Sequence, residues 1–188
     1  MVMLTDKKVI ECVPNFSEGR NLDIIDKIAS AVKSTQNVKL LNVEPDKDYN
    51  RTVITFAGEP SGVKEAAFNA ISTASELIDM SRQKGEHPRI GATDVCPIIP
   101  VANATREECV KLANELGSEV GEKLGIPVYL YEDAARSEER RNLENIRKGE
   151  YEGLEQKLRD WVPDYGPAEY NDKVRKSGAT VIGARFFL

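Results

Sequence analysis

The sequence has few of the residues that build metal sites and disulfide frameworks. It contains one histidine and three cysteines in 188 residues. The cysteines, Cys12, Cys96 and Cys109, are far apart and odd in number, which argues against a disulfide framework. With one histidine and no closely spaced cysteine pair, the chain also lacks the ligand spacing of a zinc site, and we expect no bound metal.

The sequence also lacks the features of membrane, secreted and nucleic-acid-binding proteins. No stretch approaches the roughly 20 apolar residues that a membrane-spanning helix needs, and the N-terminal segment has no hydrophobic region of signal-peptide length. The net charge of −5 argues against long-range attraction to nucleic acid. We therefore expect a cytoplasmic protein with neither a nucleic-acid nor a membrane partner, and a length of 188 residues allows one domain with a sizeable core.

Hydrophobic periodicity predicts alternating strands and helices, and their order favours an α+β fold: a ferredoxin-like mixed β-sheet of about six strands layered with helices. Pro97 and Pro100 cannot donate ladder hydrogen bonds, so the strand that contains them is expected at an edge or interrupted. The expected strands are 8–13, 38–44, 51–57, 94–101, 127–131 and 179–188. The expected helices begin at Asn21, at Pro60 (ending near Arg82) and at the capping box of Thr105 (ending at Gly125), followed by exposed helices within 134–160.

Three segments have both a structural and a functional interpretation. The turn Asn15–Arg20 precedes a helix, so its N–H groups either bind an anion or only cap that helix. The segment Asp164–Ala168 reads as a rigid turn or as a backbone edge for a flat ligand. The strand 179–188 is strongly apolar, and because such a strand needs cover on both faces, we expect one face to contact another domain or subunit.

The only histidine, His87, is the one side chain whose ordinary pKa suits proton transfer near neutral pH. It lies in a predicted loop after a helix, and loops on a rigid scaffold often carry chemistry. Glu86 or Asp94 is placed to orient the ring, and Arg89 to hold a substrate carboxylate. The alternative is a structural histidine.

Cys96 follows His87 by nine residues, so a Cys–His hydrolase is a second interpretation. The apolar run around Cys96 favours a buried and unreactive thiol instead.

Several segments together resemble one family, the formiminotransferases, also called glutamate formimidoyltransferases. The resemblance extends over nearly the whole chain. The segments that carry it are Glu11–Arg20, Asn50–Val53, Ile78–Ser81, Gly85–Arg89, Asp94–Pro97, Pro127–Tyr131 and Pro163–Ala168.

This resemblance implies transfer of the formimino group from N-formiminoglutamate to N5 of tetrahydrofolate, a step of histidine degradation, with tetrahydrofolate as co-substrate. It implies that His87 aligns with the catalytic histidine, acting as a proton shuttle, and that Glu44 stands where the family has an assisting acid, more often aspartate. It implies folate contacts at Gly166, Pro167, Ala168 and Gly178. Both substrates carry carboxylates, so the candidate clamps are Arg20, Arg51, Arg89 and Arg185.

The family's fold pairs two ferredoxin-like subdomains with folate between their sheets. The chain stops at Leu188, where the family continues, so the resemblance implies that residues 1–188 are the N-terminal subdomain without the C-terminal one. We expect a homodimer or a partner chain to cover the exposed sheet. Two alternatives remain: a non-catalytic folate-binding or assembly half, and formyl transfer from N-formylglutamate.

Overall fold

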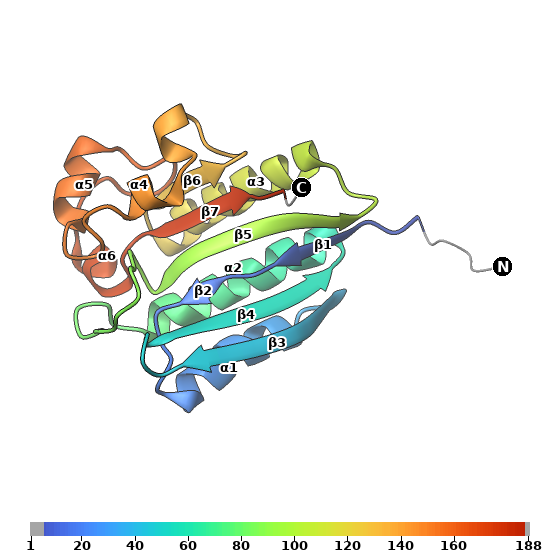
Figure 1. Ribbon diagram of the computed structural model, residues 1–188, viewed down its shortest axis with the longest axis horizontal. Coiled ribbons are helices and arrows are strands. Elements are labelled where there is room, and N and C mark those ends of the chain that lie inside the picture. The colour runs from blue at the N-terminus through green and yellow to red at the C-terminus, as the bar shows by residue number, and fades with distance from the viewer. Residues whose placement is uncertain (1–5, 187–188) are drawn as a thin grey trace.

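The computed structural model describes residues 6–186 and shows a seven-stranded mixed sheet with helices α1, α2 and α3 side by side on one face (Figure 1). The strands are β1 (Val9–Cys12), β2 (Asn15–Phe16), β3 (Val38–Asp46), β4 (Arg51–Gly58), β5 (Thr93–Ala102), β6 (Val128–Glu132) and β7 (Thr180–Ala184). The helices are α1 (Leu22–Lys33), α2 (Pro60–Leu77), α3 (Arg106–Leu124), the 3₁₀ turn η1 (Glu138–Arg140), α4 (Leu143–Arg147), α5 (Leu154–Asp160) and α6 (Asp172–Ser177).

The first half of the chain has the ferredoxin-like topology that the element order predicted. β3 pairs with β4, which pairs with β1 and β2, and these pair with β5, all antiparallel. β7 then adds parallel to β5, and β6 adds parallel to β7. The α+β fold class is confirmed, with β2 and the short helix α6 as the two elements that the sequence did not predict.

Local signals set the helix boundaries. The Asn21 side chain accepts from the N–H groups of Asp23 and Ile24 at the start of α1, and Thr105 forms a complete capping box with Glu108 before α3. The prediction that α2 runs to Arg82 is wrong, because the chain becomes extended at Ile78 and buries that side chain after only 18 helical residues.

The prediction that the proline-containing strand lies at an edge is also wrong. β5 is central, with β1 and β2 on one side and β7 on the other. Pro97 lies opposite the break between β1 and β2, where its carbonyl accepts from the Val13 N–H at 3.3 Å. Pro100 pairs with Ile10 beyond the last residue of β5 that β7 reaches, Ile98. The prolines therefore fall where the ladder does not need their missing N–H groups.

The apolar strand near the C-terminus is covered within the chain itself. β7 lies between β5 and β6, and all of its residues are buried. The expectation that one face of this strand awaits another domain or subunit is wrong for Thr180–Ala184, because two hydrophobic cores enclose it. The expected strand end at 187–188 lies outside the described residues.

The two faces of the sheet are covered differently. The core on one face is built with α1, α2 and α3 and includes Phe56 of β4 and Ile98 of β5. On the other face, Ile146 of α4 and Leu154 of α5 cover only the β6–β7 part of the sheet. Within residues 6–186, no helix has the length and apolar character to cross a membrane.

Candidate active site

A hollow lies on the face of the sheet that α4 and α5 cover incompletely. Its volume is about 420 Å³, within the range of small-molecule sites. The strands form its floor, α4 forms one wall, and the loop between α2 and β5 brings His87 to its edge. The lining residues are Glu11, Val13, Asn15, Arg51, His87, Val95, Pro97, Ile99, Tyr131, Leu143, Arg147 and Arg185.

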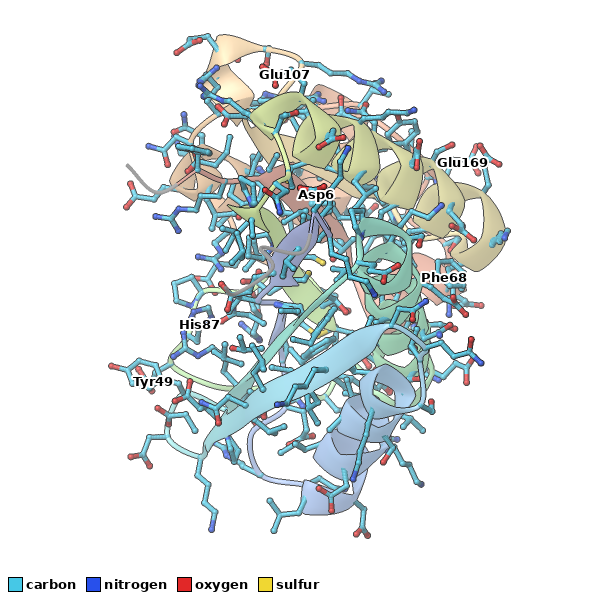
Figure 2. All side chains as sticks on the ribbon, turned by 90° about the vertical axis from the view of Figure 1, so that its right-hand side faces the viewer. Asp6, Tyr49, Phe68, His87, Glu107 and Glu169 are labelled. Carbon is cyan, nitrogen blue, oxygen red and sulfur yellow. The ribbon has the colours of Figure 1, made fainter. Side chains whose placement is uncertain are left out.

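Strand alternation explains how one set of strands builds both a core and a hollow. Neighbouring residues point to opposite faces, so Cys96 and Ile98 enter the helix-side core while Pro97 and Ile99 line the hollow. Figure 2 shows the same division, with His87 and Tyr49 on one side of the sheet and Phe68 of α2 on the other.

The loop that carries His87 is anchored on its β4 side by a polar network. The backbone before β4 turns at Asn50, whose φ is +51°. The Asn50 side chain accepts from the Gly19 N–H at 2.9 Å and donates to the Lys84 carbonyl at 3.0 Å. Glu18 accepts from the Asn21 N–H at 2.9 Å and from the Gln83 side chain at 3.1 Å. The turn that had an anion-binding interpretation therefore positions the histidine loop.

The same loop is anchored on its other side by Arg89. Its guanidinium contacts Glu152 at 3.0 Å and Glu150 at 3.4 Å, and it donates to the Gln83 carbonyl at 2.8 Å. The loop then ends at Gly91, where the backbone meets Gly178 so closely that a side chain on Gly178 would overlap Gly91 and the Ile90 carbonyl.

The surroundings of His87 favour its neutral form. Partial burial lowers the pKa of His87 from 6.5 to about 4, with the charges of Arg147 and Arg51 acting in the same direction. The ring is therefore neutral at pH 7 and has a nitrogen lone pair available to accept a proton. Neither Glu86 nor Asp94 forms a hydrogen bond with it in the described structure, and Asp94 bonds instead with the Ile90 N–H and Arg147.

The candidate clamps separate into two groups. Arg51 and Arg185 line the hollow with His87. Arg20 lies outside it and donates to the carbonyls of Lys47 and Lys84. Arg89 is buried and paired with two glutamates, as described above. The structure thus brings two of the four arginines to the histidine and uses the other two to hold loops.

Arg147 is the residue that the sequence analysis missed. It fell within a charge-rich stretch read as an exposed helix, yet it lines the hollow and forms an ion pair with the buried Asp94. A signal was present, because Leu143 and Arg147 are spaced i, i+4 and so share one face of α4.

The remaining candidates lie outside the hollow. Glu44 pairs with Val53 across β3 and β4, and strand alternation places it on the same face as Arg51, at the sheet's exposed edge. Gly166 packs against Gly121 of α3 and the Ile126 carbonyl, with a φ of +80°. Neither Pro167 nor Ala168 lines the hollow.

Cys96 does not share a face with His87. It is fully buried in the helix-side core, with its sulfur 3.5 Å from that of Cys12. The Cys–His hydrolase interpretation is therefore wrong, because the sheet separates the two side chains. All three cysteines are free thiols, and no group of three or more potential metal ligands occurs among residues 6–186.

Comparisons of this chain with a family model and with known proteins agree on one family. Residues 9–185 match the formiminotransferase domain, N-terminal subdomain. A formimidoyltransferase-cyclodeaminase from Gallus gallus is 54% identical over 183 residues, covering 96% of this chain and 33% of that protein. Glutamate formimidoyltransferases from Thermoplasma acidophilum and Streptococcus pyogenes are 48% and 45% identical, and the chain spans 59% of the length of each.

Proposed function

The chain belongs to the formiminotransferase family, with its N-terminal subdomain fold, and on that premise we propose that it acts in the transfer of a formimino group from N-formiminoglutamate to N5 of tetrahydrofolate. We propose that residues 1–188 are one subdomain, and that the complete catalytic unit includes a second subdomain or partner chain over the uncovered part of the sheet. The metabolic setting that fits this reaction is histidine degradation.

One observation carries the proposal: a neutral imidazole stands at the edge of an arginine-lined hollow. In the reaction, N5 attacks the formimino carbon and a tetrahedral intermediate forms. N5 loses a proton, and the nitrogen of glutamate gains one as the C–N bond breaks. His87, neutral at pH 7, takes the first proton and returns it to the leaving nitrogen.

We expect substrate binding to change the pKa of His87. Arg51 contributes to the low pKa of His87, and a substrate carboxylate paired with Arg51 would offset that charge. We therefore expect the pKa of His87 to rise toward 6.5 in the substrate complex, which brings the imidazole closer to the optimum for proton transfer at neutral pH. The arginines also align the two substrates, which contributes a further part of the acceleration.

The roles of the other candidates follow from their positions. Arg51 and Arg185 serve as carboxylate clamps, while Glu44, at the sheet edge, assists only when a second subdomain closes over that face. Gly166, Pro167, Ala168 and Gly178 lie outside the hollow, so any folate contact they make is with a part of the molecule remote from N5.

A transfer assay tests the proposal. The chain is assayed with N-formiminoglutamate and tetrahydrofolate, alone and mixed with a separately expressed formiminotransferase C-terminal subdomain. His87→Ala is expected to reduce turnover on the order of 10²-fold or more with a modest change in folate affinity, because it removes the proton carrier. Cys96→Ala is the matched control on the opposite face and leaves turnover unchanged.

The results separate the proposal from its alternatives. Full turnover by His87→Ala would exclude the proton shuttle. Tetrahydrofolate binding without turnover under both conditions would favour a non-catalytic half. Replacement of the donor by N-formylglutamate tests formyl transfer in the same assay.

A further inference from the structure

We propose that Arg147, held by Asp94, is a further carboxylate-binding residue of the hollow beside Arg51 and Arg185, and that Arg147 and Arg51 together bind the two carboxylates of an N-substituted glutamate beside His87. The identity of this ligand rests on the proposed function, whereas the assignment of Arg147 rests on the geometry alone.

Asp94 fixes the position of Arg147. Asp94 is 1% exposed, and its carboxylate accepts from the Ile90 N–H at 3.0 Å and forms an ion pair with the Arg147 guanidinium. A buried carboxylate without its partner would be costly, so this pair holds the arginine in one place. Asp94 is therefore a positioning residue that acts through Arg147.

Arg147 keeps unused hydrogen-bonding capacity toward the hollow. A guanidinium has five N–H donors, and Asp94 is the only carboxylate that pairs with Arg147 among the described residues. Its Nε is buried and has no partner there. That nitrogen is closed off from solvent, so a carboxylate in the hollow would bind the terminal N–H groups of Arg147 that Asp94 leaves free.

The Arg51 side chain in the same hollow also has free hydrogen-bonding capacity. Its guanidinium forms no hydrogen bond or ion pair among residues 6–186, and its Nε is buried without a partner. Its guanidinium lies 5.8 Å from the centre of the Tyr49 ring. The hollow is thus lined by two guanidinium groups with free hydrogen-bonding capacity, with Arg185 as a third cation and Glu11 as the one acidic lining residue.

The placement of these two arginines favours a dicarboxylate over a single compact anion. Arg51 begins β4, whereas Arg147 ends α4, which packs over β6 and β7. The strand order places β2 and β5 between the two elements. Two guanidinium groups from different elements, which line one hollow together with His87, match a ligand that carries a carboxylate at each end.

An N-substituted glutamate has two sources in the proposed reaction. One is the formimino donor, and the other is the glutamate tail of the folate. The two differ in what is attached to the glutamate nitrogen, so N-formyl-L-glutamate and p-aminobenzoyl-L-glutamate serve as stable probes for the donor and the tail. The tighter probe identifies which substrate occupies the hollow.

Calorimetry and NMR on the full chain test the proposal. Because His87 is the only histidine, its ring signals report binding beside it without assignment. Arg147→Gln is expected to weaken the tighter probe about tenfold or more, and Arg147→Lys to lose less because it keeps the charge. Arg159→Gln is the matched control, because Arg159 is exposed on α5 and, among residues 6–186, pairs only with Glu155.

Asp94→Asn separates positioning from binding. The variant keeps Arg147 but weakens its anchor. We therefore expect weaker probe binding and a change of the His87 ring signal in the same direction as in Arg147→Gln. If Asp94→Asn does not fold, the two Arg147 variants still decide the question.

Three results would overturn the inference: unchanged affinity in Arg147→Gln, an unmoved His87 signal on binding, or no probe binding by the wild-type chain up to the solubility limit. Failure of the proposed function looks different, since the probes would bind through Arg147 while the transfer assay gave no product. Transfer with an unchanged KM in Arg147→Gln would instead remove only the inference.

Discussion

The two faces of the sheet use the same strands for opposite purposes. The helix-side face is closed and apolar, with Ile98 and Cys96 packed among the residues of α2 and α3. The other face is covered only over β6 and β7, and beside that cover it presents Arg51, Arg147 and His87 around a hollow. One face supplies stability, and the other holds charged groups whose hydrogen-bonding capacity is incompletely used.

The strands therefore position the side chains that line the hollow, while the helices stabilise the sheet from its other face. Cys12 and Cys96 are next to hollow-lining residues in the sequence, but burial raises the pKa of Cys12, whose thiol stays protonated in the core. His87 lies outside the strands altogether, and its loop is fixed by contacts with segments 18–21, 49–50 and 150–152.

The difference between the two faces is tested most directly by truncating the side chains of two neighbouring residues of β5. Ile98→Ala is expected to lower the free energy of unfolding by about 3 kcal/mol, because it leaves a cavity in a closed core. Ile99→Ala makes the same chemical change but widens a hollow that already exists, so about 1 kcal/mol is expected. Urea unfolding of both variants measures the difference, and equal costs would contradict the division between the faces.

A second test disturbs the close contact between Gly178 and Gly91, at the end of the loop that carries His87. Gly178→Ala places a methyl group against Gly91 and the Ile90 carbonyl at a φ of +67°, and we expect a loss of about 2 kcal/mol. Gly125→Ala is the control for an ordinary left-handed glycine, because its φ of +63° and ψ of +36° are open to an alanine at a modest cost and no atom lies within 4 Å of the added carbon. Only about 1 kcal/mol is expected there. Gly178, with a ψ of −159°, combines a less favourable backbone conformation with the close approach.

The two glycine variants should also differ at the site. Only Gly178→Ala is expected to shift the NMR signals of the His87 ring, since Gly178 contacts the end of its loop. Identical stabilities and unshifted ring signals in both variants would show that the close approach does not position the histidine.

Sequence reasoning was most successful where structure depends on local signals. Asn21, Thr105 and Gly125 mark helix ends through contacts with their own neighbours, and all three were identified. The position of β5 was not, because the prolines suggested an edge and only the pairing with distant β1 and β7 shows where N–H groups are unnecessary. Which strands pair, and in which register, depends on residues far apart in the sequence and cannot be inferred from a short segment.

The same distinction applies to the candidate site. The sequence singled out His87, and Arg51 and Arg185 line the same hollow. It did not show that Arg89 is paired with Glu150 and Glu152, or that Arg147 is the arginine that Asp94 directs to the hollow. Those pairings join residues more than 50 positions apart, and charge alone does not distinguish a loop anchor from a ligand clamp.

The smallest predicted effect is a pH dependence of the free energy of unfolding that arises from His87, on the face with the hollow. The pKa of His87 is about 4 in the folded chain and about 6.5 when unfolded, so between these values the unfolded state binds more protons. The contribution of His87 to the free energy of unfolding is therefore fully present above pH 6.5 and is lost as the pH falls toward 4. Its size is reduced because the ring is partly exposed and water screens the charges.

Comparison with His87→Gln isolates this contribution from that of the carboxylates, among them Asp94, whose pKa is raised by burial. The wild-type chain should lose stability more steeply than His87→Gln between pH 6.5 and 4. In Arg147→Gln, the ring should titrate at a higher pH, because the charge of Arg147 adds to burial, the main cause of the low pKa, as do the charges of Arg51 and Arg89. An NMR midpoint near 6.5 in the wild-type chain would show that the hollow does not act on the imidazole, and the contrast between the faces would then be one of shape alone.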